Sequence, residues 1–85
     1  FKKKLVTLPS CHWINNPPIE LKTGEFFKCK AKIRYRQNDQ ECQIKVLKDH
    51  SIEVEFESLQ RAITPGQYIV FYKNEYCLGG GIIDK

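Results

Sequence analysis

Residues 26–36 read FFKCKAKIRYR, and from Phe27 onward apolar and basic side chains alternate. Successive side chains of a β-strand point to opposite faces of a sheet, so this alternation predicts one strand with two unlike faces. The apolar face would hold Phe27, Cys29, Ala31, Ile33 and Tyr35. The basic face would hold Lys28, Lys30, Lys32, Arg34 and Arg36. A register slip of one residue would bury all five cations, so we expect the pairing of this strand to be firmly fixed.

The basic face is a candidate surface for nucleic acid. Side chains on one face of a strand recur about every 6.6 Å, which is close to the interval between phosphates on a nucleic-acid backbone. A solvated face without a ligand is the alternative, because the acidic stripe Glu53, Glu55 and Glu57 could pair with the cations. If the strands form a meander, the strand that carries Gln43 and Lys45 separates the two stripes by roughly 9–10 Å. Direct pairing with that acidic stripe is then not expected.

The size and charge of the chain set limits on its fold. It has 85 residues, of which 41% are hydrophobic, enough for one small domain. Such a domain buries only about 60–65% of its unfolded surface, which favours a closed or nearly closed architecture. The net charge of +4 is a moderate excess, and residues 1–4 would form a linker from an upstream domain. The first residue is Phe1 and no methionine occurs, so we expect a piece of a longer protein.

Cysteine usage bears on metal binding and on the cellular compartment. Cys11, Cys29, Cys42 and Cys77 form no CxxC pair and have no histidine at zinc-ligand spacing, so we expect no metal site. Cys29 and Cys42 fall on the apolar sides of their strands, which favours free, reduced thiols over disulfides. Reduced thiols indicate a cytoplasmic location. The sequence contains no signal peptide and no apolar run of membrane length, so no membrane partner is expected.

Alternating segments separated by turn residues predict further strands. Residues 42–46 and 52–57 would follow the basic strand as a meander. Residues 5–14 would form a first strand that is broken or bulged at Pro9-Ser10. No segment has helical periodicity. Six strands with short turns favour an all-β fold, which we predict to be a small six-stranded antiparallel β-barrel.

Glycines mark two features of the C-terminal half. Pro65-Gly66 fits the central positions of a type II turn, and residues 68–72 follow as a short, largely apolar strand. The run Gly79-Gly80-Gly81 is not followed by the Lys-Ser/Thr of a phosphate-binding loop. It therefore favours a bulge or a sharp bend in a closing strand.

No group of residues has the pattern of a catalytic site. Cys11 and His12 are neighbours in sequence, but adjacent side chains of a strand point apart, so they do not make a nucleophile and its base. His50 lies beside Asp49 in a predicted turn, where a solvated loop residue is the default. We therefore expect no catalytic residue in this chain.

Several segments, in order, resemble the C-terminal domain of the bacterial tRNA-specific 2-thiouridylases. Besides Trp13-Ile14, they are RYRQ at 34–37, AITPGQ at 62–67, VFY at 70–72 and CLGGGII at 77–83. The order and spacing of these segments carry the resemblance, which covers nearly the whole chain. Leu59 departs from the family, which usually has a proline at that position.

The resemblance implies that residues 1–85 are a single C-terminal β-barrel domain, similar to the second domain of translation elongation factors. The parent enzyme would use ATP and magnesium to activate C2 of the wobble uridine in tRNA anticodons. A sulfur-donor protein would supply the sulfur, carried as a cysteine persulfide. Upstream catalytic domains would hold the nucleotide-binding loop and the catalytic cysteines, so this chain alone would have no cofactor and no enzymatic activity.

The resemblance also implies site residues, because Arg34, Tyr35 and Gln67 match positions of tRNA contact in the family. Arginine can bind a phosphate in a bidentate manner, and Tyr35 could offer a stacking face or a hydroxyl group. The basic strand adds four further candidates for tRNA binding, which are Arg36, Lys32, Lys30 and Lys28. The main alternative is a barrel that docks against acidic surfaces of other domains or of a protein partner without touching RNA. An autonomous enzyme is the third hypothesis, and it lacks a clustered nucleophile, base and anion site.

Overall fold

The computed structural model describes residues 2–9, 12–14, 24–33, 38–61 and 63–85. Within these ranges the chain forms seven strands. They are β1 (Lys2–Val6), β2 (His12–Trp13), β3 (Phe26–Lys32), β4 (Gln40–Val46), β5 (Ile52–Gln60), β6 (Tyr68–Lys73) and β7 (Tyr76–Ile82). The described residues contain no helix that could cross a membrane.

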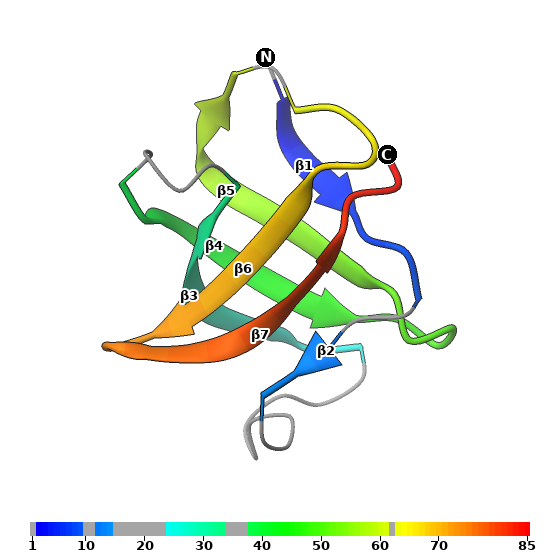
Figure 1. Ribbon diagram of the computed structural model, residues 1–85, viewed down its shortest axis with the longest axis horizontal. Coiled ribbons are helices and arrows are strands. Elements are labelled where there is room, and N and C mark those ends of the chain that lie inside the picture. Colours follow the sequence, from blue (N-terminus) through cyan, green and yellow to red (C-terminus); the bar gives the residue numbers. More distant parts are fainter. Residues whose placement is uncertain (1, 10–11, 15–23, 34–37, 62) are drawn as a thin grey trace.

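All neighbouring strands are antiparallel and lie in the order β1-β5-β4-β3-β6-β7-β2. The sheet curls so that β6 and β7 cross in front of β4 and β5 (Figure 1). An isolated bridge between Thr7 and Ile83 joins the end of β1 to the end of β7. The Val6 amide also donates to the Lys85 carbonyl at 2.7 Å, and the Leu8 amide donates to the Ile82 carbonyl at 2.8 Å. The predicted all-β antiparallel barrel is confirmed.

The predicted number of six strands is wrong, because residues 5–14 contribute to two strands instead of one. β1 pairs with β5, whereas His12 and Trp13 of β2 pair with Gly80 and Gly79 of β7. These two partners belong to different parts of the curled sheet, so the chain must leave β1 before it can form β2.

Residues 2–4, expected to be part of a linker, are instead the first three residues of β1. Lys4 lies opposite Glu55 of β5, and the side chains of Lys3 and Lys4 are exposed. β5 is the longest strand and needs a partner on its second edge, because unpaired strand edges leave amides and carbonyls without hydrogen bonds. Lysines suit that position, since their charged ends stay in water while their backbone pairs.

The inner face of β3 is apolar as the alternation predicts. Phe27, Cys29 and Ala31 are buried, and the residues between them are exposed or half-buried. The meander is confirmed as well, because β4 lies between β3 and β5. The barrel interior is completed by almost fully buried side chains from the other strands. They include Leu5, Ile44, Ile52, Val54, Ile69, Phe71 and Ile83.

The glycines of β7 allow close approach by β2. Gly79 has a φ of 147°, and a Cβ atom there would lie 2.1 Å from the His12 carbonyl oxygen. Phe71 pairs with Gly79 and Tyr72 pairs with Cys77, so Leu78 is an extra residue in β7. The predicted bulge in the closing strand is therefore present.

The turn before β6 has the expected conformation. Gly66 has a φ of 93°, which the third position of a type II turn requires, and the Gln67 amide donates to the Thr64 carbonyl at 3.4 Å. The Gly66 amide donates to the Ile83 carbonyl at 2.8 Å, which ties the turn to the end of the chain.

Candidate nucleic-acid interface

The lysines of β3 share the outer face of the barrel. Lys28 and Lys30 are exposed and Lys32 is half-buried, so the predicted orientation of these three candidates is confirmed. The other three candidates of this segment, Arg34, Tyr35 and Arg36, lie outside the described residues.

Two of these lysines have an acidic partner on the same sheet. Lys30 lies opposite Glu41 of β4, with 3.7 Å between Nζ and Oε2, and the Lys32 Nζ is 3.5 Å from Oδ1 of Asp39. The stripe on β5 was the predicted competitor for the cations, and this nearer pair of carboxylates was not predicted. The signal was available, because Glu41 precedes the buried Cys42 on the returning strand and Asp39 lies two residues before it, directly ahead of β4. Exposed pairs of this kind contribute about 0.2–1 kcal/mol, so a phosphate could replace the carboxylate.

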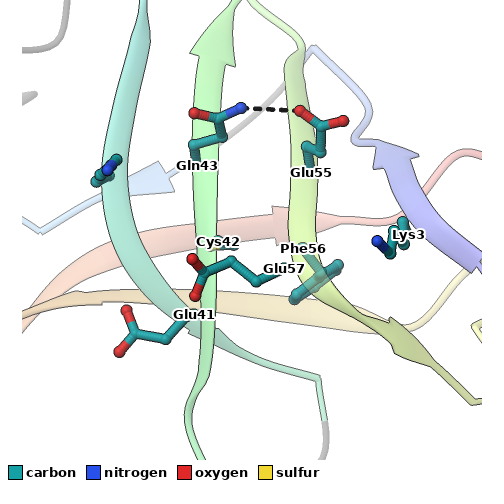
Figure 2. Close-up of a pocket in the computed structure, with 8 residues that line it drawn as sticks. Lys3, Glu41, Cys42, Gln43, Glu55, Phe56 and Glu57 are labelled. Atoms are coloured by element: carbon teal, nitrogen blue, oxygen red, sulfur yellow. Dashed lines mark hydrogen bonds between the residues drawn. The ribbon is translucent and has the colours of Figure 1, made fainter.

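The acidic stripe of β5 is separated from β3 by β4, as the meander geometry predicts. Lys28 lies opposite Gln43 of β4, which in turn lies opposite Glu55 of β5. The Gln43 side-chain amide donates to Oε1 of Glu55 at 2.8 Å (Figure 2). The Lys4 Nζ approaches Oε2 of Glu55 from the other side at 3.8 Å. Glu55 therefore has partners on β4 and β1, and within the described part of the chain Lys28 has no ion pair.

Two surface grooves flank the outer face of β3. One, over β4 and β5, has a volume of about 360 Å³, and its described lining includes two lysines but three glutamates. Figure 2 shows the side chains of this groove. The other lies between β3 and the β6–β7 hairpin and has a volume of about 320 Å³. Its described lining includes Lys28, Lys30 and Lys73 with a single carboxylate, that of Glu41. The second groove is the better site for a polyanion on charge alone.

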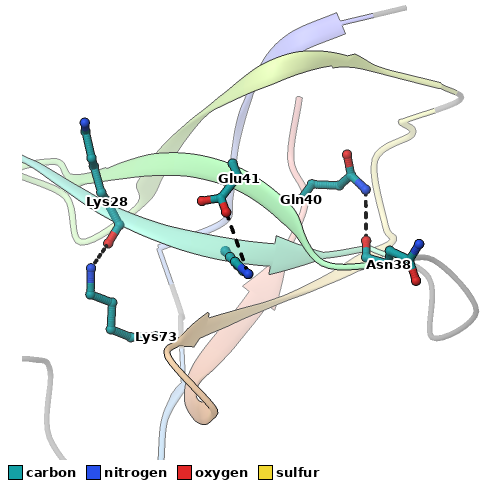
Figure 3. A network of polar contacts seen from close by, with 6 residues as sticks. Lys28, Asn38, Gln40, Glu41 and Lys73 are labelled. Atoms are coloured by element: carbon teal, nitrogen blue, oxygen red, sulfur yellow. Dashed lines mark hydrogen bonds and ion pairs between the residues drawn. The ribbon is translucent and has the colours of Figure 1, made fainter.

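Lys73 links the hairpin to β3 at this second groove. Its Nζ donates to the Lys28 carbonyl at 2.9 Å (Figure 3) and lies 5.1 Å from the centroid of the Phe27 ring. The side chain is exposed, so its charge adds to that of the β3 lysines on this side of the barrel.

Tyrosines of β6 lie next to the lysines on the outer face, which the sequence analysis did not anticipate. Tyr72 pairs with Lys30, and the Nζ of Lys32 is 5.9 Å from the centroid of the Tyr72 ring. Tyr68 is on the same face of β6 and is 48% exposed. The signal was the alternation of Tyr68, Val70 and Tyr72 with the buried Ile69 and Phe71.

Gln67 has a structural partner close by. Its side-chain Oε1 accepts a hydrogen bond of 2.9 Å from the Thr64 amide, and the residue is half-buried. Gln67 therefore shapes the turn before β6, and its tRNA contact remains a prediction from the family resemblance.

The described cysteines are free thiols: Cys29 and Cys42 are buried and Cys77 is exposed. The two buried sulfur atoms lie 3.8 Å apart on paired strands. Contact with Cys29 and burial raise the pKa of the Cys42 thiol far above its ordinary value, so this thiol is neutral and a poor nucleophile. Cys11 lies outside the described residues.

Comparison with known proteins places these features in a family. The sequence model of the aminomethyltransferase β-barrel domain family matches residues 3–83 of this chain. The tRNA-specific 2-thiouridylase MnmA of Marinobacter nauticus is 47% identical over 85 residues, which cover 100% of this chain and 20% of that protein. The protein of the same name from Methylococcus capsulatus is 48% identical over 73 residues, covering 86% of this chain and 19% of that protein. The protein of the same name from Francisella philomiragia is 61% identical over 60 residues, which cover 71% of this chain and 17% of that protein. This chain thus spans about a fifth of the length of the curated relatives it matches.

Proposed function

Since this chain belongs to the aminomethyltransferase β-barrel domain family, in the form carried by tRNA-specific 2-thiouridylases, we propose that it holds tRNA for the rest of a longer enzyme. The observation that carries the proposal is the row of lysines on the outer face of β3, which continues onto Lys73 of the hairpin. Charges placed in this way on a rigid sheet neutralise phosphates without reading the base sequence.

The parent protein would thiolate C2 of the wobble uridine in tRNA anticodons. This step is proposed from the relatives that this chain resembles, whose name describes them as 2-thiouridylases of tRNA. ATP, magnesium, the sulfur donor and the catalytic cysteines would act in parts of the protein outside this chain. The buried free thiols on β3 and β4 support a reducing, cytoplasmic location.

The carboxylates beside Lys30 and Lys32 are compatible with this role. Both ion pairs lie on the surface, where the side chains keep much of their hydration and the pairs are weak. An incoming phosphate would exchange one anionic partner of Lys30 or Lys32 for another, while Lys28 and Lys73 would gain an anionic partner.

The salt dependence of tRNA binding by the intact protein tests the proposal. If the barrel face neutralises roughly three to five phosphates, it should contribute a slope of roughly −2 to −5 to the logarithm of affinity against the logarithm of salt concentration. The double variant Lys28→Gln with Lys30→Gln should weaken binding and make the slope shallower. Arg34→Gln with Arg36→Gln should act in the same direction. Cognate and non-cognate tRNA should be affected about equally, because phosphate contacts do not distinguish sequence.

A matched control is the double variant Lys3→Gln with Lys4→Gln. These residues lie on β1, separated from β3 by β5 and β4, and the change removes the same amount of charge. It should alter the slope less than the β3 variant.

The second candidate function is docking of the barrel against other protein domains. It is favoured by the ion pairs of Lys30 and Lys32, which show that these cations can be satisfied by carboxylates. An unchanged tRNA affinity and salt slope in the folded β3 and arginine variants would contradict tRNA binding and favour docking.

A further inference from the structure

The side chain of Tyr68 lies against Gly80 of the neighbouring strand. A Cβ atom built on Gly80 would be 2.8 Å from Cε2 and 3.2 Å from Cζ of the Tyr68 ring, and 2.3 Å from the Ile69 carbonyl oxygen. The ring thus occupies the space that any side chain at position 80 would need. Gly80 makes room for an aromatic ring that leans across β7.

One side of this ring is supported by the protein and much of its surface is open. Tyr68 is 48% exposed, and Ile82, which pairs with it on β7, is 40% exposed. The residue that follows Tyr68, Ile69, points into the core and is fully buried, which anchors the strand beneath the ring. A ring held in this way loses little conformational freedom when a planar group stacks on it.

Lysines of β3 share the outer face with this ring, although the ring itself leans toward β7 on the other side of β6. Lys32 of β3 pairs with Val70, and Val70 is two residues from Tyr68 on the same face of β6. Diagonal neighbours of this kind are about 7–8 Å apart. Lys30 pairs with Tyr72 one step further along. The outer face of β3, β6 and β7 therefore carries both lysines and an exposed aromatic ring.

We propose that Tyr68, which lies on Gly80, is a stacking platform for an unpaired RNA base. The lysines of β3 would neutralise phosphates of the same RNA backbone. Proteins bind single-stranded RNA by combining a basic track along the backbone with aromatic rings on which bases stack. A protein partner is the other candidate for an exposed aromatic surface. RNA is favoured because the ring shares the outer face with the lysines of β3 and because it covers Gly80 while 48% of the residue stays exposed. The proposal rests on the proposed function and assigns a further residue to the same face.

Substitutions of Tyr68 in the intact protein separate stacking from other roles. Tyr68→Phe keeps the aromatic ring, whereas Tyr68→Leu keeps an apolar side chain over Gly80 but removes the ring. Tyr76→Leu is the matched control, because Tyr76 is 75% exposed and lies at the opposite end of the β6–β7 hairpin. Thermal unfolding of each variant shows whether the fold is preserved.

The probes are a transcript of a tRNA anticodon stem-loop, with single loop nucleotides replaced by 2-aminopurine, and a fully paired RNA duplex of equal length. Tyr68→Leu should weaken stem-loop binding by roughly 5- to 100-fold, the range that loss of one stacked base gives, and should leave duplex binding within about twofold. Tyr68→Phe and Tyr76→Leu should bind both probes like the wild type. At one loop position, the fluorescence of 2-aminopurine should be quenched by the wild type and by Tyr68→Phe but not by Tyr68→Leu.

Three results would overturn the platform. Wild-type affinity of Tyr68→Leu for the stem-loop excludes a stacked base, and equal loss in Tyr68→Phe assigns the effect to the hydroxyl group. A lower melting temperature of the intact Tyr68→Leu protein with unchanged RNA affinity assigns the ring to packing within the protein, such as its contact with Gly80. The lysine variants distinguish this failure from failure of the proposed function. If Lys28→Gln with Lys30→Gln weakens binding while Tyr68→Leu does not, tRNA binding stands and the platform is wrong.

Discussion

Lys30 and Glu41 lie opposite each other on β3 and β4, with their charged atoms 3.7 Å apart. This pair places a carboxylate inside the row of lysines that we propose as the tRNA-binding face. It gives the face a built-in competitor for phosphate, and both side chains are about half exposed, at 47% and 58%. The Glu41 carboxylate can be removed by substitution while every lysine of the face is kept.

Replacement of Glu41 by Gln should therefore strengthen tRNA binding by the intact protein. The change removes a negative charge beside Lys30 and frees that lysine for phosphate, so we expect a gain of about two- to fivefold in affinity at low salt, on the scale of one exposed ion pair. The gain should shrink at high salt because screening weakens both interactions. Glu53→Gln is the control, since Glu53 lies on β5 opposite Lys45, and it should change affinity less. Weaker binding by Glu41→Gln would argue against this face.

The buried thiol of Cys42 should make the domain less stable at alkaline pH. Its pKa is raised in the folded state from an ordinary value of 9.0, so the thiol stays neutral there while the unfolded chain ionises. Stability from this group is fully present below pH 9.0 and is lost as pH rises above it. At pH 10 this effect lowers the free energy of unfolding by about 1.4 kcal/mol. Urea unfolding at pH 7 and pH 10 measures it, and Cys42→Ala should show a smaller change between the two pH values than the wild type.

Gly79→Ala should destabilise the barrel more than Gly24→Ala. Both glycines have positive φ, but a Cβ at Gly79 would lie 2.1 Å from the His12 carbonyl oxygen, whereas a Cβ at Gly24 meets nothing within 4 Å. Gly24→Ala should cost about 1–2 kcal/mol of unfolding free energy from backbone strain alone. Gly79→Ala must also separate β2 from β7, so we expect a loss at least about 2 kcal/mol larger. Comparable melting temperatures for the two variants would show that β2 does not depend on this close approach.

The isolated chain should not bind ATP. The three glycines of β7 are paired with Phe71, Val70 and Ile69 of β6, so their backbone belongs to a sheet and does not form a phosphate-binding loop. Calorimetric titration with ATP and magnesium should give no saturable heat. A stoichiometric binding signal would mean that nucleotide binding is not confined to other parts of the parent protein.

Features of the fold that depend on short segments could be predicted from the sequence, whereas pairing between distant segments could not. The two faces of β3, the meander and the turn at Gly66 follow from side-chain alternation and turn chemistry within short segments. β2 is two residues long, and its pairing with Gly79 and Gly80 brings together distant parts of the chain. No periodicity can be read from so short a strand, so it was merged with β1 in the prediction.

The candidate site likewise combines features that the sequence predicts with features that depend on how the strands pair. That Lys28, Lys30 and Lys32 share an outward face was predictable from spacing alone. The ion pair with Glu41 and the contact of Tyr68 with Gly80 depend on the register of β4 and β7 against their neighbours, which the alternation of a single strand does not determine.

The bridge between Thr7 and Ile83 bears on how this domain folds during synthesis. The backbone hydrogen bonds around it join the end of β1 to residues 82–85, which are synthesised after all the other strands of the barrel. The β3–β4–β5 meander contains only neighbouring strands and can form earlier, but closure has to wait until both ends are present. Contacts of such large sequence separation slow folding, toward the millisecond-to-second range of β-barrels, and the partly formed sheet exposes the edge of β3 until β6 covers it. The nascent domain is therefore most vulnerable to aggregation until residues 82–85 are available to close the barrel.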